Sequence, residues 1–236
     1  MKDIIFLIVL FGANVIQAIT GFAGTVLAMP PSMYLLGMDN AKVVLNAMAW
    51  ISGLLIASSG FQKIRWKELM KMVVFMLFGM AAGIAICSVV SSNSLLLTIY
   101  GVIIILVALK NIFVKKTHEL PAWILILILL LAGIVHGMFV SGGALLVIYA
   151  VQVLKDKEEF RATVAPVWVV LNTFLMVSQY RQGLYTAQNI RLILVSILPL
   201  LVATWLGTKI AKKVPQKVFL YITYVLLLIS GCTLVL

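Results

Sequence analysis

The chain has 236 residues, of which 64% are hydrophobic and only 11% are charged. Soluble domains contain roughly 45–50% apolar and about 25% charged residues, so the composition excludes an ordinary soluble domain and indicates an all-α polytopic membrane protein. The net charge of +11 does not indicate nucleic-acid binding, because the lysines and arginines lie at the ends of apolar segments, where they set membrane orientation.

Ten apolar segments follow one another along the chain, separated by polar stretches or by helix-breaking residues. About 20 helical residues cross the hydrocarbon of a bilayer, and most of the segments approach that length. Because similar segments follow the first one everywhere, we interpret it as mature structure rather than a signal peptide. The expected segments are about 4–19, 24–37, 41–61, 68–90, 95–113, 122–140, 144–155, 159–180, 187–211 and 216–236.

Two of these segments, 24–37 and 144–155, are too short for a comfortable span, and each follows a glycine-rich break. The breaks read TGFAG and SGGA, and a shift of 121 residues superimposes them. With a shift of 119, Lys42 falls on Arg161. We therefore expect one transmembrane domain, 1–236, made of a first repeat at 1–113 and a second repeat at 120–236.

The distribution of basic residues predicts the topology. If each short segment forms a re-entrant hairpin with its predecessor, 14 of the 18 basic residues lie on one side, whereas one long tilted span would split them nearly evenly. We expect these basic loops in the cytoplasm and both termini outside; hairpins that crossed completely would give the same sidedness, so their depth stays open. The other side receives Lys2, Lys42, Arg181 and Arg191.

This topology gives each repeat an odd number of crossings, so the second repeat is inverted relative to the first. Inverted repeats with interrupted helices are a recurring plan of secondary transporters, with the binding site near the midplane between the repeats. We therefore expect two inverted five-segment repeats, each beginning with a broken-helix hairpin, in a multi-pass protein of the cell membrane.

The two breaks are the main candidate binding site. A helix that starts inside the membrane presents unpaired amides and a positive dipole end, which together favour a small anion. The alternative is close helix crossing, for which membrane proteins also use small residues. The candidate substrate-binding residues at the breaks are Thr20, Gly21, Phe22, Gly24, Ser141, Gly142 and Gly143.

Other polar residues at expected mid-depth extend the candidate site. Gln17, Ser52 and Asn172 are candidate cavity residues, with interhelical hydrogen bonding as the competing explanation. His136 is a candidate for proton coupling, because histidine titrates near neutral pH; the alternative is a neutral histidine at a helix contact. Trp50 and Trp168 are candidates for a cavity wall, or for ordinary packing.

The sequence contains no pattern that indicates an enzyme, a cofactor or a metal site. No carboxylate lies at the middle of an expected span, which disfavours carboxylate proton relays. Nucleophile-elbow, Walker and HExxH motifs are missing. Cys87 and Cys232 lie far apart in apolar segments, so we expect buried thiols rather than a disulfide or a metal pair.

Two stretches, GFAGTVLAMPPSMYLLG and HGMFVSGGALLVIYAV, resemble the paired glycine-rich motifs of the TauE/SafE sulfite exporter family. The resemblance covers essentially the whole chain, although the second motif has Tyr149–Gln152 where a proline is expected. It implies a membrane transporter, with sulfite, an organosulfonate or a related sulfur anion as substrate. A non-transporting scaffold or accessory subunit and an anion channel remain alternatives, and a homo-oligomer stays open.

Overall fold

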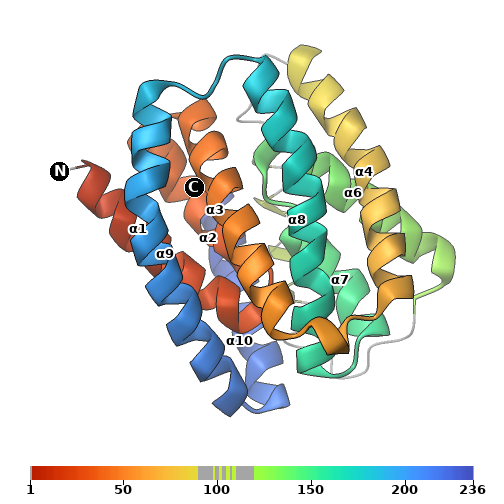
Figure 1. Ribbon diagram of the computed structural model, residues 1–236. Coiled ribbons are helices and arrows are strands. Elements are labelled where there is room, and N and C mark those ends of the chain that lie inside the picture. Colours follow the sequence, from red (N-terminus) through yellow and green to blue (C-terminus); the bar gives the residue numbers. More distant parts are fainter. Residues whose placement is uncertain are drawn as a thin grey trace.

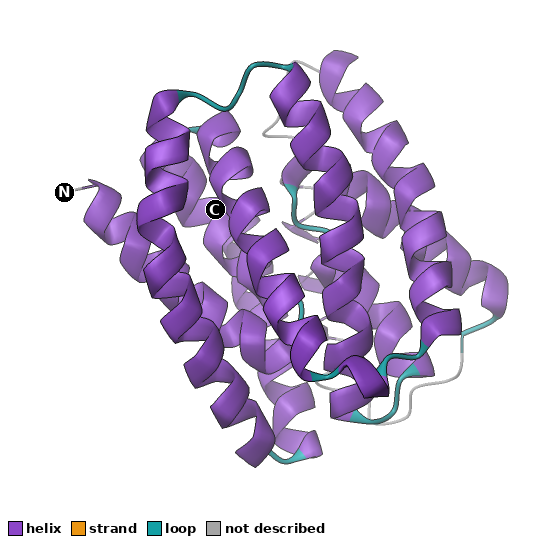
Figure 2. Cartoon of the chain, in the orientation of Figure 1, coloured by secondary structure: helices purple, strands orange, loops and turns teal. Residues whose placement is uncertain are grey.

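The computed structural model of the chain describes residues 2–89, 98, 101–102, 105–106, 108–109 and 120–235. In this part of the chain the regular structure is helical (Figures 1 and 2). The helices are α1 (Lys2–Thr20), α2 (Ala23–Leu36), α3 (Met38–Ser59), a 3₁₀ turn η1 (Phe61–Lys63), α4 (Trp66–Val89), α6 (Ala122–Phe139), α7 (Gly143–Val153), α8 (Lys157–Arg181), α9 (Ala187–Lys213) and α10 (Gln216–Val235).

These bounds confirm nine of the ten expected segments, with ends that differ by at most three residues. The expected segment 95–113 lies largely outside the described residues. Six of the described helices, α1, α3, α4, α6, α8 and α9, are long and apolar enough to cross a membrane. The chain is therefore a multi-pass membrane protein, as its composition predicts.

The described helices pair in a way that crosses the two halves of the sequence. In Figure 1, α9 lies along α1, α3 lies beside α8 at the centre, and α4 runs along α6; these three pairs have the most extensive contacts. The short helices α2 and α7 pack against each other and fold back on α1 and α6, respectively. Each half of the sequence thus contributes one short helix, α2 or α7, to the interior.

Glycines allow two of these pairs to approach until the backbones touch. A Cβ atom at Gly79 of α4 would lie 2.0 Å from the Leu130 carbonyl oxygen of α6, and one at Gly133 would lie 2.2 Å from that of Met76. On the other side of the molecule, a Cβ at Gly207 of α9 would lie 2.4 Å from the carbonyl oxygen of Val15. The hydrophobic effect does not drive helices together within lipid, so van der Waals contact at such close approaches stabilises these pairs.

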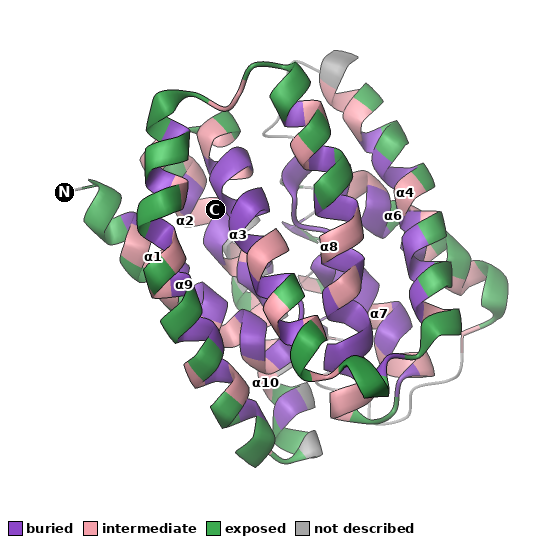
Figure 3. Cartoon of the chain, in the orientation of Figure 1, coloured by how far each residue is buried: buried purple, intermediate pink, exposed green. Residues whose placement is uncertain are grey.

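The distribution of buried and exposed residues agrees with this helix pairing. Figure 3 shows buried surface concentrated on the inner faces of α3 and α8, and exposed surface on the outer face of α9. Large apolar side chains on the outside, including Phe78, Leu198 and Trp205, are more than half exposed. Exposed apolar side chains in this number suit contact with lipid rather than water.

One end of the molecule carries most of the described basic residues. The connections α3–α4, α7–α8 and α9–α10 all lie at the lower end in Figure 1, whereas the α8–α9 connection lies at the opposite end. Lys110, Lys115 and Lys116 lie outside the described residues. The lower connections and the adjoining helix ends carry Lys63, Arg65, Lys67, Lys71, Lys155, Lys157, Arg161, Lys209, Lys212, Lys213 and Lys217.

Candidate functional site

The first helix break lies between α1 and α2. Gly21 has a φ of 86°, a backbone conformation that favours glycine, and lets the chain turn immediately after Thr20. The Thr20 hydroxyl donates to the carbonyl of Ile16 at 2.8 Å and accepts from the Ala23 amide at 3.2 Å. The Gly24 amide donates to Oε1 of Gln17 at 2.7 Å. Two side chains of α1 thus cap the positive end of α2.

The second break lies between α6 and α7. Val140 has a φ of 54°, which is uncommon for a β-branched residue and marks the point where α6 turns away. Its amide donates to the His136 carbonyl at 2.8 Å. Ser141 and Gly142 follow, and α7 begins at Gly143. Both predicted breaks are therefore present at the predicted residues.

The two breaks, about 120 residues apart in the sequence, lie directly against each other. A Cβ at Gly143 would lie 2.9 Å from the carbonyl oxygen of Phe22 and 3.4 Å from the Val26 side chain. Trp168 of α8 closes the first break, because its indole Nε1 donates to the Gly21 carbonyl at 2.8 Å. The backbone of one break is thus in contact with the backbone of the other.

The glycines at the breaks are also tightly packed. A Cβ at Gly24 would lie 2.7 Å from Cβ of Gln17, and one at Gly142 would lie 2.2 Å from the Ala132 carbonyl oxygen. A Cβ at Gly21 would lie 3.2 Å from the Cα of Arg161. Close helix crossing, the competing explanation for these small residues, therefore accounts for part of their use.

A buried polar cluster adjoins the breaks. The His136 ring nitrogen Nε2 lies 2.9 Å from Oδ1 of Asn172, and the centroid of the ring lies 5.2 Å from that of Trp168. His136 is 1% exposed and Asn172 is fully buried. Two polar atoms of this pair, Nδ1 of His136 and Nδ2 of Asn172, have no hydrogen-bond partner among the described residues. Such atoms are costly to bury, so they are the strongest local sign of a ligand.

The cluster continues along α3 and α8. The Asn46 amide Nδ2 donates to the backbone carbonyl of Asn172 at 3.4 Å and to Oε1 of Gln179 at 2.9 Å. Oδ1 of Asn46 also lacks a partner among the described residues. Seven residues, or two helical turns, separate Asn172 from Gln179, so both lie on one face of α8. Buried amides therefore connect His136 to the end of α8.

Two predicted site residues do not join this cluster in the described contacts. Trp50 donates to Oγ1 of Thr173 at 2.9 Å, on a partly exposed face between α3 and α8. Ser52 is fully buried, and its hydroxyl has no partner among the described residues. Gln17, as described above, caps α2.

The sequence reasoning missed four residues that the structure brings to the site. Asn46 and Gln179 belong to the amide chain, and Arg161 and Lys42 each lie beside a break. Arg161 is 4% exposed and donates from Nε and Nη2 to the Ala18 carbonyl at 2.9 and 2.6 Å. The Lys42 ammonium lies 5.9 Å from the ring centroid of Phe139, at the end of α6. The shift of 119 residues that carries Lys42 onto Arg161 was the available signal.

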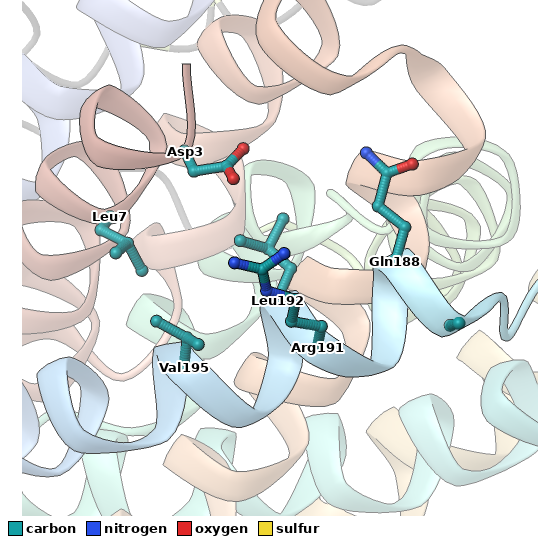
Figure 4. Close-up of a pocket in the computed structure, with 7 residues that line it drawn as sticks. Asp3, Leu7, Gln188, Arg191, Leu192 and Val195 are labelled. Carbon is teal, nitrogen blue, oxygen red and sulfur yellow. The ribbon is translucent and has the colours of Figure 1, made fainter. Parts of the chain in front are cut away.

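Three of the cavities near these helices bear on the site. The largest of these, about 530 Å³, lies between α1 and α9, away from the breaks, with Asp3, Gln188, Arg191 and apolar side chains on its walls (Figure 4). A cavity of about 10 Å³, no larger than one water, lies beside Gln17 and Gly24. The third, about 300 Å³, extends from Lys42 and Gln179 to Val140 at the second break.

Groups of three or more metal-binding side chains are missing from the described part of the chain. A family model described as "Sulfite exporter TauE/SafE" matches residues 5–234 of the chain. No curated protein and no solved structure matches it. The family match extends over both helix breaks and over every residue of the buried polar cluster.

Proposed function

Because the chain belongs to the TauE/SafE sulfite exporter family, we propose that it is a secondary transporter that exports sulfite, an organosulfonate or a related sulfur oxyanion. The family consists of transporters of such small anions. The observation that carries the proposal is the contact between the two broken helices, where the Phe22 carbonyl faces Gly143. Discontinuous helices that meet inside a membrane are the usual substrate site of secondary transporters.

The proposed site is the contact between the breaks and the polar cluster beside it. The amides and dipole ends of α2 and α7 supply positive potential without a formal charge. Nδ2 of Asn172 and Nδ1 of His136, which lack partners among the described residues, supply donors when a ligand is present. In this proposal Thr20 and Ser141 contribute hydroxyls, and Gly21, Gly24, Gly142 and Gly143 let the backbone come close.

Neutral donors suit a carrier. A buried arginine or lysine would bind an oxyanion strongly and release it slowly, whereas helix dipoles and amides bind it more weakly and reversibly. In this proposal the capping contacts of Thr20 and Gln17 hold α2 in place while the site is empty. An incoming anion competes with Gln17 for the Gly24 amide.

The helix pairing supports the inverted repeat. Under the shift that aligns the breaks, α1 corresponds to α6 and α4 to α9, so the pairs α1–α9 and α4–α6 exchange with each other. The pair α3–α8 maps onto itself. We place the basic connections in the cytoplasm, and an inside-negative potential then favours anion exit by about 2.3 kcal/mol per charge per 100 mV.

Reconstituted vesicles test the proposal. Vesicles that contain the purified protein and ³⁵S-sulfite are diluted into buffer with unlabelled sulfite, sulfate, methanesulfonate or lactate. Accelerated exchange with sulfite, saturating at high concentration, supports a carrier, and linear flux supports a channel. Asn172→Leu, which removes the unpartnered amide, should abolish exchange, whereas Thr173→Val on the outer side of the same helix should keep it.

Two results would contradict the proposed transport function. Absence of flux together with no effect of any anion on the melting temperature supports a scaffold, since a ligand that prefers the folded state raises that temperature. Full exchange by the Asn172→Leu variant, with normal folding, would show that substrate binds elsewhere.

A further inference from the structure

The cavity of about 300 Å³ opens between α3, α4, α6 and α8 at the end of the molecule that carries the α8–α9 connection. Its walls are mixed: Lys42 and Asp39 come from α3, Ser178, Gln179 and Gln182 from the end of α8, and the remaining lining is apolar. Gly137 near the end of α6 and Val140 at the second helix break also line it. The cavity therefore connects the surface to the neighbourhood of the proposed binding site.

The polar contacts continue beyond the floor of this cavity. Gln179, which lines it, accepts from Asn46, and Asn46 donates in turn to the carbonyl of Asn172. Oδ1 of Asn46, although the residue is fully buried, has no partner among the described residues. Asn172 then meets His136 at 2.9 Å. A series of buried amides thus extends from the cavity to the polar cluster at the breaks.

Lys42 gives the cavity its chemical preference. In the described part of the chain its ammonium forms no hydrogen bond and no salt bridge, although Asp39 lines the same cavity one turn earlier. Its repeat equivalent, Arg161, is fully engaged with the Ala18 carbonyl and with Glu158. An ammonium in a concave, partly apolar space, with no hydrogen bond or salt bridge among the described residues, attracts anions.

We propose that this cavity is the extracytoplasmic vestibule of the transporter, and that Lys42 attracts the oxyanion there and passes it between the vestibule and the His136–Asn172 cluster. The inference rests on the proposed function for the identity of the anion. It adds a second, charged binding position to the neutral one at the breaks, on the side where the substrate leaves.

Cys87 lines the same cavity and reports on it directly. In a Cys232→Ser background, Cys87 is modified either with anionic sulfonatoethyl methanethiosulfonate or with cationic trimethylammonioethyl methanethiosulfonate. Each rate is divided by the rate of the same reagent with a small free thiol, which removes intrinsic differences. The ratio of the two normalised rates also cancels any change in the thiolate fraction of Cys87.

The expected ratio favours the anionic reagent by roughly 10-fold, as for steering by a concave charged site. Lys42→Gln should bring it to one or below, Lys42→Arg should keep it, and Asp39→Asn should raise it. Arg191→Gln removes a positive charge beside a different cavity at the same end, between α1 and α9 (Figure 4), and should leave the ratio unchanged. Raising the salt concentration to about 1 M should reduce the wild-type preference, because the Debye length falls to about 3 Å.

Protection links the vestibule to the substrate. Methanesulfonate, which does not react with thiols, should slow modification of Cys87 in the wild type and lose this effect in Lys42→Gln. Equal normalised rates for both reagents in the wild type, or an unchanged ratio in Lys42→Gln, would overturn the inference whatever the transport data. A Lys42-dependent anion preference without sulfite exchange would instead remove the proposed function and leave an anion-attracting cavity.

Discussion

Arg161 donates two hydrogen bonds, of 2.9 and 2.6 Å, to the backbone carbonyl of Ala18, 143 residues earlier in the chain. Ala18 lies in the last turn of α1, directly before the first break, where the helix leaves carbonyls without intrahelical donors. The same shift of 121 that aligns the breaks carries Ala18 onto Phe139, whose ring lies under the Lys42 ammonium. Each break is thus held or faced by a cation from the other half of the sequence.

The Arg161 contact predicts a loss of stability on substitution. Arg161→Gln removes both bonds and leaves a buried carbonyl unpaired; hydrogen bonds to charged groups contribute about 1.5–3 kcal/mol each. Arg161→Lys keeps one donor and should lose less. Arg65→Gln is the control, because the Arg65 side chain is 60% exposed and its ion pair with Glu159 is screened. Melting curves in detergent measure all three, and equal melting temperatures would contradict the assignment.

The packing at the second break predicts that even a methyl group is not tolerated there. A Cβ at Gly142 would meet the Ala132 carbonyl oxygen at 2.2 Å, so Gly142→Ala must push α7 away from α6. Overpacking of this kind typically costs about 1–3 kcal/mol. Gly12→Ala is the matched control, since its Cβ would have no atom within 4 Å. A Gly142→Ala protein that melts like Gly12→Ala would show that α6 and α7 are not tightly packed.

His136 provides a prediction about pH. His136→Gln keeps a polar contact to Asn172 but removes the only titratable side chain described on α6. If the imidazole carries a coupled proton, the pH profile of sulfite exchange by this variant should differ from that of the wild type between about 5 and 8, where histidine titrates. Exchange rates in vesicles over that range measure the effect. A retained pH profile would assign the histidine to packing.

The orientation is testable with single cysteines in a Cys87→Ser, Cys232→Ser background. Lys63→Cys and Lys213→Cys should be protected from a membrane-impermeant maleimide added to intact cells, because these positions belong to the basic connections. Asp39→Cys and Arg181→Cys, at the opposite end, should react. Labelling of Lys63→Cys from outside would reverse the proposed topology.

The helices were predictable from the sequence because apolar runs and helix breakers are local signals. The breaks at Gly21 and Gly142 were also predictable, since one shift of 121 residues superimposes the two glycine clusters. The capping of α2 by Gln17 was not, because a side chain seven residues before the amide it binds leaves no periodic pattern.

The contacts of the buried charged side chains could not be predicted from the sequence either. Sequence spacing made Lys42 and Arg161 equivalent, yet it could not show that Arg161 is engaged with Ala18 while Lys42 faces a cavity. That difference depends on the three-dimensional packing, which brings the start of α8 to the end of α1. Asn46 and Gln179 likewise became visible only once α3 and α8 were placed side by side.

The glycine-mediated contacts indicate which helices we expect to move together. Gly207 brings α9 into close contact with α1, and Gly79 and Gly133 bring α4 into close contact with α6. Each helix that ends at a break is thus packed against a long helix from the opposite half of the sequence. These groups of packed helices therefore do not coincide with the two halves of the sequence. We expect a motion that separates the breaks to carry α1, α2 and α9 as one group and α4, α6 and α7 as another, with sliding at the contacts between α3 and α8 and between α2 and α7.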